Sequence, residues 1–259
     1  MLEQTISPKA WKLTEYQQGD YYIAVCEEYL LIDAHHILSD GTSMSVLGDA
    51  IRDAYQGIPI LPELLVPSVQ SQLEQQDEEK AREALAYFTK ELGGVEVDSN
   101  LPVDLPDATS SLQGNLLKMK LDVPFDTVEQ IARQFDVTKG TIFLTAFAYA
   151  LAKTTCQTES LFCTVSSGRH HDPLLSHTVG MFVRTLPFYM KFDEDGRIED
   201  QLKAARRELS AAIKHDCVSF AALSKELGLR SDMNVVCHAR DQPCLFSCPP
   251  SSNISKCNR

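Results

Sequence analysis

The sequence predicts an α/β protein of two lobes that divide near residue 100. Short β-like runs alternate with amphipathic helical segments, a stretch with the composition of a linker interrupts them, and the strand and helix pattern then starts again. A chain of 259 residues can bury a core in each lobe. We predict a first lobe at residues 1–95, a linker at 96–113 and a second lobe at 114–236. An irregular, disordered tail is predicted at 237–259.

The first lobe is expected to carry a hairpin and two helices. Residues 21–34, YYIAVCEEYLLIDA, read as two β runs joined at two glutamates. Residues 42–57 then place apolar side chains at helical spacing and end at a glycine, and residues 78–92 repeat this pattern before a glycine pair. The adjacent histidines His35 and His36 therefore lie in a strand-to-helix turn, where a rigid scaffold commonly presents functional groups.

The second lobe is expected to alternate strands and helices after a linker rich in Pro, Ser, Thr and Asp. We predict strands at 116–123 and 160–167, helices at 125–135, 141–152 and 198–215, and an apolar segment at 179–192. The tail is rich in Ser, Pro and Cys and shows no periodicity, which predicts an irregular and disordered segment.

The charge of the chain excludes some partners. The formal net charge is -12 and the pI is near 5.0, without a dense Lys/Arg patch, so neither nucleic acid nor an anionic membrane is a natural partner. The N-terminus does not resemble a signal peptide, and no apolar run approaches the roughly 20 residues that cross a bilayer. We expect a cytoplasmic protein whose substrate is small or is carried by another protein.

The eight cysteines are interpreted in two groups. One group stands alone in apolar or helical surroundings, as buried thiols do: Cys26, Cys156, Cys163 and Cys217. The other group lies in or next to the tail but lacks paired C-x2-C spacing, so we assign no metal site to it: Cys237, Cys244, Cys248 and Cys257.

The histidine turn has the pattern H-H-x-x-x-D-G at residues 35–41. A second pair, His170 and His171, lacks both the acid and the glycine and precedes a proline, so we interpret it as surface loop. His177 and His215 have no supporting neighbours in the sequence and receive the same interpretation.

The stretch HHILSDG resembles the HHxxxDG motif of condensation domains of nonribosomal peptide synthetases, which share their fold with chloramphenicol acetyltransferase. The likeness extends from about residue 15 to about residue 230. Other stretches similar to family segments are AYQG, YFTKELGG, SSGRHHDPLLSHTVGMFVRTLPFYM and HDCVSF.

The resemblance implies a chloramphenicol acetyltransferase-like two-lobe fold and an acyltransferase activity. Such domains form an amide bond between an acyl or peptidyl thioester and an aminoacyl acceptor. Both substrates would arrive on phosphopantetheine arms of carrier domains, and the chain itself would bind no cofactor.

The resemblance also assigns roles within the turn. His36 would be the catalytic residue in a channel between the lobes, and His35 would pack and hydrogen-bond. Gly41 would allow close backbone approach to a developing oxyanion. The resemblance pairs Asp40 with an arginine of an early motif, whereas a triad interpretation has Asp40 orient His36. Candidates for the channel or the lobe interface are Thr42, Ser43 and Arg184.

The chain departs from the family pattern in three respects. The two earliest motifs have no counterpart, so Asp40 is expected to be unpaired unless another arginine substitutes. Arg184 replaces an asparagine and Ser219 a proline, and the likeness ends near residue 235. The sequence therefore predicts a condensation domain with an incomplete first lobe and C-terminus. Alternatives are a non-catalytic remnant, a module completed by another chain, and a free-standing acyltransferase that uses coenzyme A.

Overall fold

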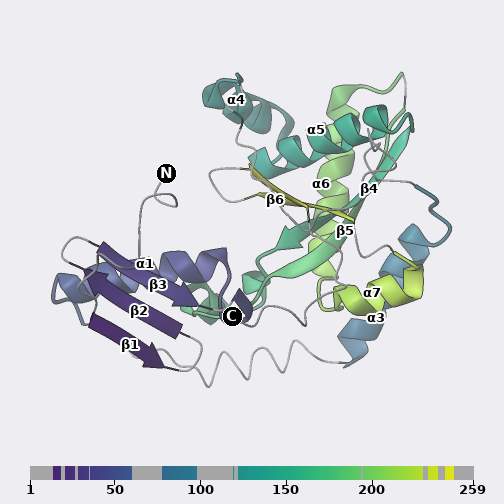
Figure 1. Cartoon of the computed structure of the whole chain (residues 1–259). Coiled ribbons are helices and arrows are strands. Elements are labelled where there is room, and N and C mark those ends of the chain that lie inside the picture. The colour runs from purple at the N-terminus through teal and green to yellow at the C-terminus, as the bar shows by residue number, and fades with distance from the viewer. Residues whose placement is uncertain are drawn as a thin grey trace, which may run out of the picture. The chain divides into compact units, whose positions relative to one another are not determined.

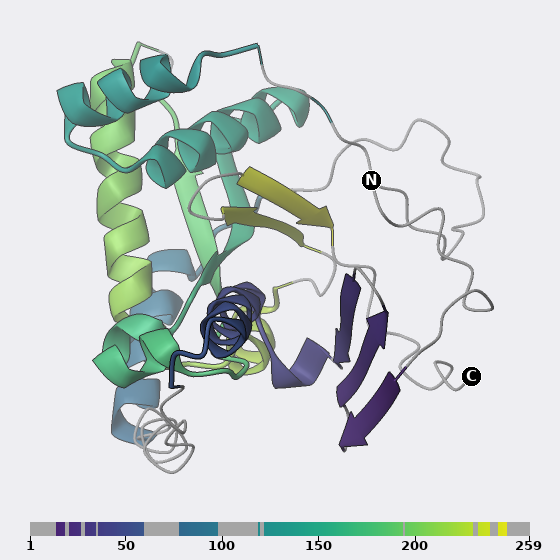
Figure 2. The same cartoon turned by 90° about the vertical axis from the view of Figure 1, so that its left-hand side faces the viewer.

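The chain forms two compact units that contain both helices and strands, which confirms the predicted α/β class (Figures 1 and 2). Unit 1 comprises residues 1–72 and 167–183, and unit 2 comprises residues 73–166 and 184–259. The computed structural model describes residues 14–18, 21–26, 29–34, 36–59, 78–97, 119, 122–193, 195–229, 233–238 and 243–247.

Unit 1 contains a three-stranded antiparallel sheet in the order β1-β2-β3. The predicted hairpin is present, with Ile23 opposite Ile32. The third strand leads through a short 3-10 helix into a long helix, which confirms the strand-to-helix turn. The elements are β1 (Thr14–Gln18), β2 (Tyr21–Cys26), β3 (Tyr29–Ala34), η2 (His36–Leu38), α1 (Gly41–Tyr55), η3 (Arg169–His171) and η4 (Pro173–His177).

Unit 2 contains a mixed four-stranded sheet in the order β5-β4-β6-β7, in which only β4 and β6 are parallel neighbours. Its strands are β4 (Glu159–Ser166), β5 (Arg184–Lys191), β6 (Asn234–His238) and β7 (Pro243–Ser247). Its helices are α3 (Glu78–Leu92), α4 (Phe125–Phe135), α5 (Lys139–Thr154), α6 (Ile198–Lys214) and α7 (Phe220–Leu227). No helix among the residues described is long and apolar enough to cross a bilayer.

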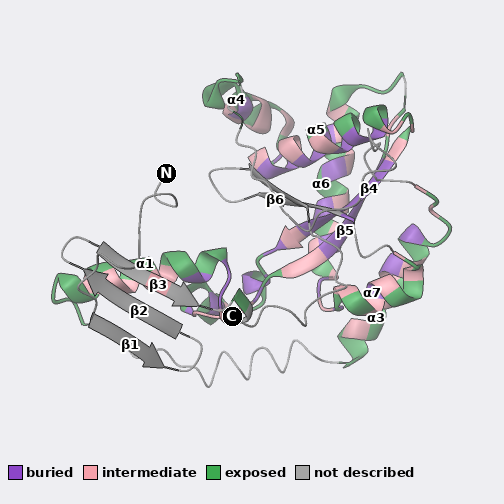
Figure 3. Cartoon of the chain, viewed as in Figure 1, coloured by how far each residue is buried: buried purple, intermediate pink, exposed green. Residues whose placement is uncertain are grey.

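Strand β4 is buried on both faces because helices cover each side of it (Figure 3). Side chains alternate between the faces of a strand. Accordingly Leu161 and Cys163 join a core with α3 and α7, whereas Phe162 joins a second core with α5 and α6. This explains why apolar residues follow one another at 161–163 and do not alternate with polar ones.

The compact units differ from the predicted lobes in two places. The sequence places α3 in the first lobe, whereas its Ala84, Phe88 and Leu92 pack in a core of unit 2. Residues 167–183 fall within the predicted second lobe but belong to unit 1. A segment belongs to the unit whose core buries its apolar face. A division of the chain at one point in the sequence does not show which core that is. Of the predicted linker, only Glu96 and Val97 are among the described residues.

Within the segment predicted to be an irregular tail, which begins at residue 237, the structure describes the last two residues of β6 and the whole of β7 as strand. Strands β6 and β7 pair in antiparallel register, with Cys237 opposite Cys244, and Val235 of β6 lies beside Cys163 of β4. Main-chain hydrogen bonds define these strands and require no alternation of side chains, so periodicity did not reveal them. The rest of the tail, and most of the strand predicted at 116–123, lie outside the described residues.

Two side chains, those of Cys156 and His215, have surroundings that differ from the prediction. Cys163 is buried and Cys217 is half-buried, as expected, but Cys156 is exposed in the turn after α5. His215 is not in a surface loop: it caps the C-terminus of α6, and its ring stacks on that of Tyr87 with 3.9 Å between centroids.

Ser219 is the N-cap of α7. Its hydroxyl accepts a hydrogen bond from the Ala222 amide at 3.2 Å. We expect Ser219→Ala to lower the free energy of unfolding of unit 2 by about 1 kcal/mol, because an amide of the first turn loses its acceptor. Denaturant unfolding measures the change, with the exposed Ser210→Ala on α6 as the control. Equal stability of the two variants would contradict this role.

Candidate active site in unit 1

The helix after the histidines begins at a side-chain cap. Asp40 is the N-cap of α1 in extended conformation, and its Oδ1 accepts from the Ser43 amide at 2.8 Å. The carboxylate thereby satisfies an amide that the first turn of the helix would otherwise leave unpaired. The preceding turn carries His36, while His35 lies outside the described residues.

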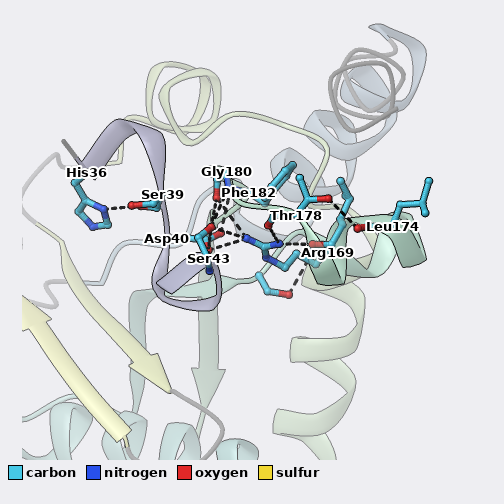
Figure 4. Close-up of polar contacts among 11 residues, drawn as sticks. His36, Ser39, Asp40, Ser43, Arg169, Leu174, Thr178, Gly180 and Phe182 are labelled. Atoms are coloured by element: carbon cyan, nitrogen blue, oxygen red, sulfur yellow. Dashed lines mark hydrogen bonds and ion pairs between the residues drawn. The ribbon is translucent and has the colours of Figure 1, made fainter. Parts of the chain in front are cut away.

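His36 is exposed, and its ring has a defined orientation. Its Nδ1 lies 2.9 Å from the Ser39 carbonyl oxygen (Figure 4). A carbonyl can only accept a hydrogen bond, so Nδ1 carries the proton and Nε2 is the basic nitrogen of the neutral ring. The turn therefore presents an imidazole in the tautomer that a proton acceptor at Nε2 requires.

Asp40 does not form a triad with His36 in the part of the chain that the structure describes. Its carboxylate accepts hydrogen bonds from Ser43, Arg169 and the Phe182 amide, and the His36 ring lies on the other side of the turn (Figure 4). Asp40 thus holds the turn in place through these hydrogen bonds. Among the described residues, it makes no hydrogen bond to the imidazole of His36.

Arg169 is the partner of Asp40. Its Nη2 lies 2.8 Å from Oδ1, and the two side chains are 6% and 1% exposed. Asp40 was expected to be unpaired unless another arginine substituted, and Arg169, 129 residues further along the chain, is that arginine. His170 and His171 are exposed, as predicted for that segment, but the residue before them is buried.

The remaining donors of Arg169 fix the segment in which it lies. Nη1 donates to the Leu175 carbonyl and, at 2.6 Å, to the Thr178 carbonyl. The guanidinium also lies over the Phe182 ring, 4.6 Å from its centroid. One side chain therefore neutralises Asp40 and closes the turn that contains η4.

Ser43 lies at the centre of the same network and is fully buried. Its hydroxyl is 2.8 Å from Asp40 Oδ1 and 2.8 Å from the Gly180 carbonyl oxygen. It accepts from Arg169 Nη2 at 2.9 Å and from the Gly180 amide at 2.9 Å. The network thus joins the first turn of α1 to residues 178–182.

The other candidates have different surroundings. Thr42 and Gly41 are exposed at the start of α1, and Arg184 is half-buried at the start of β5 in unit 2. A Cβ built on Gly41 would have no described atom within 4 Å. The space beside this backbone is therefore open among the described residues.

The family model for the condensation domain matches residues 21–238, which is most of the chain. This chain belongs to the condensation-domain family. Relatives include bacitracin synthase 2 of Bacillus licheniformis, 29% identical over 216 residues, and tyrocidine synthase 2 of Brevibacillus parabrevis, 29% identical over 210 residues. The matches cover 80% and 78% of this chain but only 8% and 6% of those synthases.

Solved structures support the fold of this condensation domain, which is the chloramphenicol acetyltransferase-like fold. The condensation domain from the monacolin K polyketide synthase MokA matches with a TM-score of 0.63 and 21% identity, over 84% of this chain and 51% of that one. The first condensation domain of the calcium-dependent antibiotic synthetase matches with a TM-score of 0.60 and 17% identity, over 83% and 58% of the two chains.

Sequence reasoning missed Arg169 and the Gly180 and Phe182 amides of this condensation domain. A signal was present, because Arg169 lies inside the family-like stretch SSGRHHDPLL. The polar residues next to Arg169 favour a surface loop, so the sequence did not indicate that Arg169 is buried. Only the fold shows that the arginine turns inward while the two histidines turn outward.

The pKa of Asp40 is set by opposing effects. Burial by itself raises the pKa, but hydrogen bonds from Ser43, Arg169 and the Phe182 amide together hold it below its usual value. The carboxylate therefore stays charged in the folded protein at neutral pH, as the ion pair requires.

We expect unit 1 to lose stability as the pH falls below about 4. Because the folded pKa of Asp40 is below the unfolded one, its contribution is complete above the unfolded pKa and is lost as pH falls through the folded pKa. Hydrogen exchange of the α1 amides, followed from about pH 6 to pH 3 in the parent and in Asp40→Asn, measures this change. Identical pH dependence of the two proteins would show that this carboxylate does not contribute.

Proposed function

We propose that this chain catalyses condensation-type acyl transfer, in which a carrier-bound donor thioester and an aminoacyl acceptor form an amide in nonribosomal peptide synthesis. The observation that carries the proposal is the exposed His36, held with Nε2 as its basic nitrogen, on a turn fixed by the Asp40–Arg169 pair. The condensation-domain family and its synthetase relatives support the class of reaction.

In this proposal the acceptor amine attacks the thioester carbonyl carbon. The C–N bond forms, the C–S bond breaks, and the sulfur of the donor arm leaves as a thiol that carries the proton given up by the amine. An α-amino group has a pKa of about 8, so roughly a tenth of it is already neutral at pH 7 and a strong base is unnecessary. His36 orients this amine and takes its proton at Nε2 as the tetrahedral intermediate forms.

The start of α1 is proposed to stabilise the developing oxyanion. Free amides at a helix N-terminus point toward anions, and the open space beside Gly41 lets a substrate approach the backbone there. The amide of Ser43 is already bound to Asp40, which leaves the earlier amides of the turn for this role.

The substrates are proposed to arrive on phosphopantetheine arms of carrier domains, with the chain itself binding no cofactor. The synthetases related to this chain are far longer than the matched region, which is consistent with a domain that works beside others. We make no assignment of the amino or acyl groups.

Single-turnover amide formation tests the proposal. The purified chain is mixed with a library of aminoacyl donors and acceptors on separate carrier proteins, and mass spectrometry follows the product on the acceptor. A parallel reaction supplies the donors as coenzyme A thioesters. We expect product with carrier-bound donors. Product only from coenzyme A donors, or none from a chain shown to be folded by circular dichroism, would contradict it.

A further inference from the structure

The hydroxyl of Ser43 makes more hydrogen bonds than helix capping requires. Capping uses only the Ser43 amide, which donates to Asp40 at 2.8 Å. The hydroxyl additionally contacts Asp40, Arg169 and both backbone groups of Gly180. Since Ser43 has no exposed surface, no water can replace these contacts without a rearrangement.

The hydrogen-bonding capacity of this hydroxyl is fully used. A serine oxygen has one proton to donate and two lone pairs that accept. Arg169 Nη2 and the Gly180 amide occupy the lone pairs, and the proton has Asp40 Oδ1 and the Gly180 carbonyl as acceptors. Removal of the hydroxyl would leave the half-buried Gly180 amide without this partner.

Ser43 is connected to His36 through three consecutive steps. The hydroxyl and amide of Ser43 hold the Asp40 carboxylate. Asp40 follows Ser39 directly, so its position sets the direction of the Ser39 carbonyl. That carbonyl binds His36 Nδ1 at 2.9 Å and fixes both the ring plane and the tautomer.

We propose that Ser43 is a positioning residue of the acyl-transfer site, which sets the orientation and tautomer of His36 without touching the substrate. The proposal rests on the proposed function. Residues 178–182 serve as the fixed support, because Arg169, Ser43 and Asp40 all bind their backbone. A shift of this support moves the Ser39 carbonyl and with it the imidazole.

The test compares Ser43→Ala with Ser45→Ala, the same change two residues later at an exposed position of α1. We expect Ser43→Ala to lower the single-turnover rate by about tenfold to a hundredfold, the scale of a misplaced catalytic group, with the half-saturating concentration of acceptor carrier unchanged. Ser45→Ala should match the parent. Rates are divided by the folded fraction of each variant.

A second readout does not require activity. Nitrogen-15 NMR of the imidazole rings, with His36 assigned by its loss in His36→Ala, reports which ring nitrogen carries the proton. We expect one tautomer, protonated at Nδ1, in the parent and in Ser45→Ala, and a mixture of tautomers in Ser43→Ala. If Ser43→Ala does not fold, Ser43→Cys retains a side chain but hydrogen-bonds weakly, and the same change is expected.

Several outcomes would overturn the proposal. A Ser43 variant with the parent rate and a single Nδ1-protonated tautomer shows that the hydroxyl does not position His36. A loss that vanishes after correction for the folded fraction shows a purely structural role. If the parent makes no product, the proposed function fails, while the tautomer measurement still decides the role of Ser43.

Discussion

Arg169→Met is expected to destabilise unit 1 by about 3–5 kcal/mol, because it leaves the Asp40 carboxylate buried without a cation. The carboxylate is only 1% exposed, so water does not compensate for the lost guanidinium. The Leu175 and Thr178 carbonyls lose their donor at the same time. Hydrogen exchange of amides in α1 and η4 measures the loss in this unit separately from unit 2.

Two controls distinguish the loss of the Asp40–Arg169 ion pair from the general effect of removing an arginine. Arg133→Met removes an arginine whose side chain is 83% exposed and whose pair with Glu129 is at the surface, so we expect little change. Combining Asp40→Asn with Arg169→Met removes the uncompensated charge, and the double variant should be more stable than the sum of the single losses predicts. Strict additivity would show that the two residues do not stabilise each other.

His36→Ala is expected to reduce the single-turnover rate of amide formation by about a hundredfold to ten-thousandfold, the usual contribution of a positioned proton acceptor. Its stability should be close to that of the parent, because the side chain is exposed. His177→Ala, an exposed histidine in η4 of the same unit, is the matched control and should retain the parent rate.

The residual activity of the His36 variant is informative in its own right. A small residual rate would show that the rest of the site still orients the two substrates. Such a rate is expected because the amine needs little help to lose its proton. A variant that is as fast as the parent would remove His36 from the mechanism. A variant that is inactive but also unfolded would be replaced by His36→Gln, which keeps a polar side chain at the exposed position.

Much of the fold could be predicted from local pattern. The hairpin, the turn with His36, and the helices α1, α3, α4, α5 and α6 all follow from periodicity within a short window. The cap at Asp40 and the glycine after α7 are also local features, but they were not predicted.

The parts that could not be predicted depend on distant pairing. Arg169 reaches Asp40 across 129 residues, and β6 lies beside β4 only because the sheet brings them together. Ser43 was a candidate for the channel or lobe interface from its place in the motif, yet its surroundings come from Gly180 and Arg169. Contacts of this type are set by the fold, and no spacing along the chain encodes them.

The connection between β4 and β5 has a consequence for protein engineering. Both strands belong to unit 2, but the connecting residues 167–183 belong to unit 1 and supply Arg169. A fragment cut anywhere in 96–113 would hold Asp40 alone, and the other fragment would hold Arg169 alone. A chimera that exchanges the first part of this chain must therefore exchange residues 167–183 as well. Otherwise Asp40 of one parent would be separated from its ion-pair partner, Arg169.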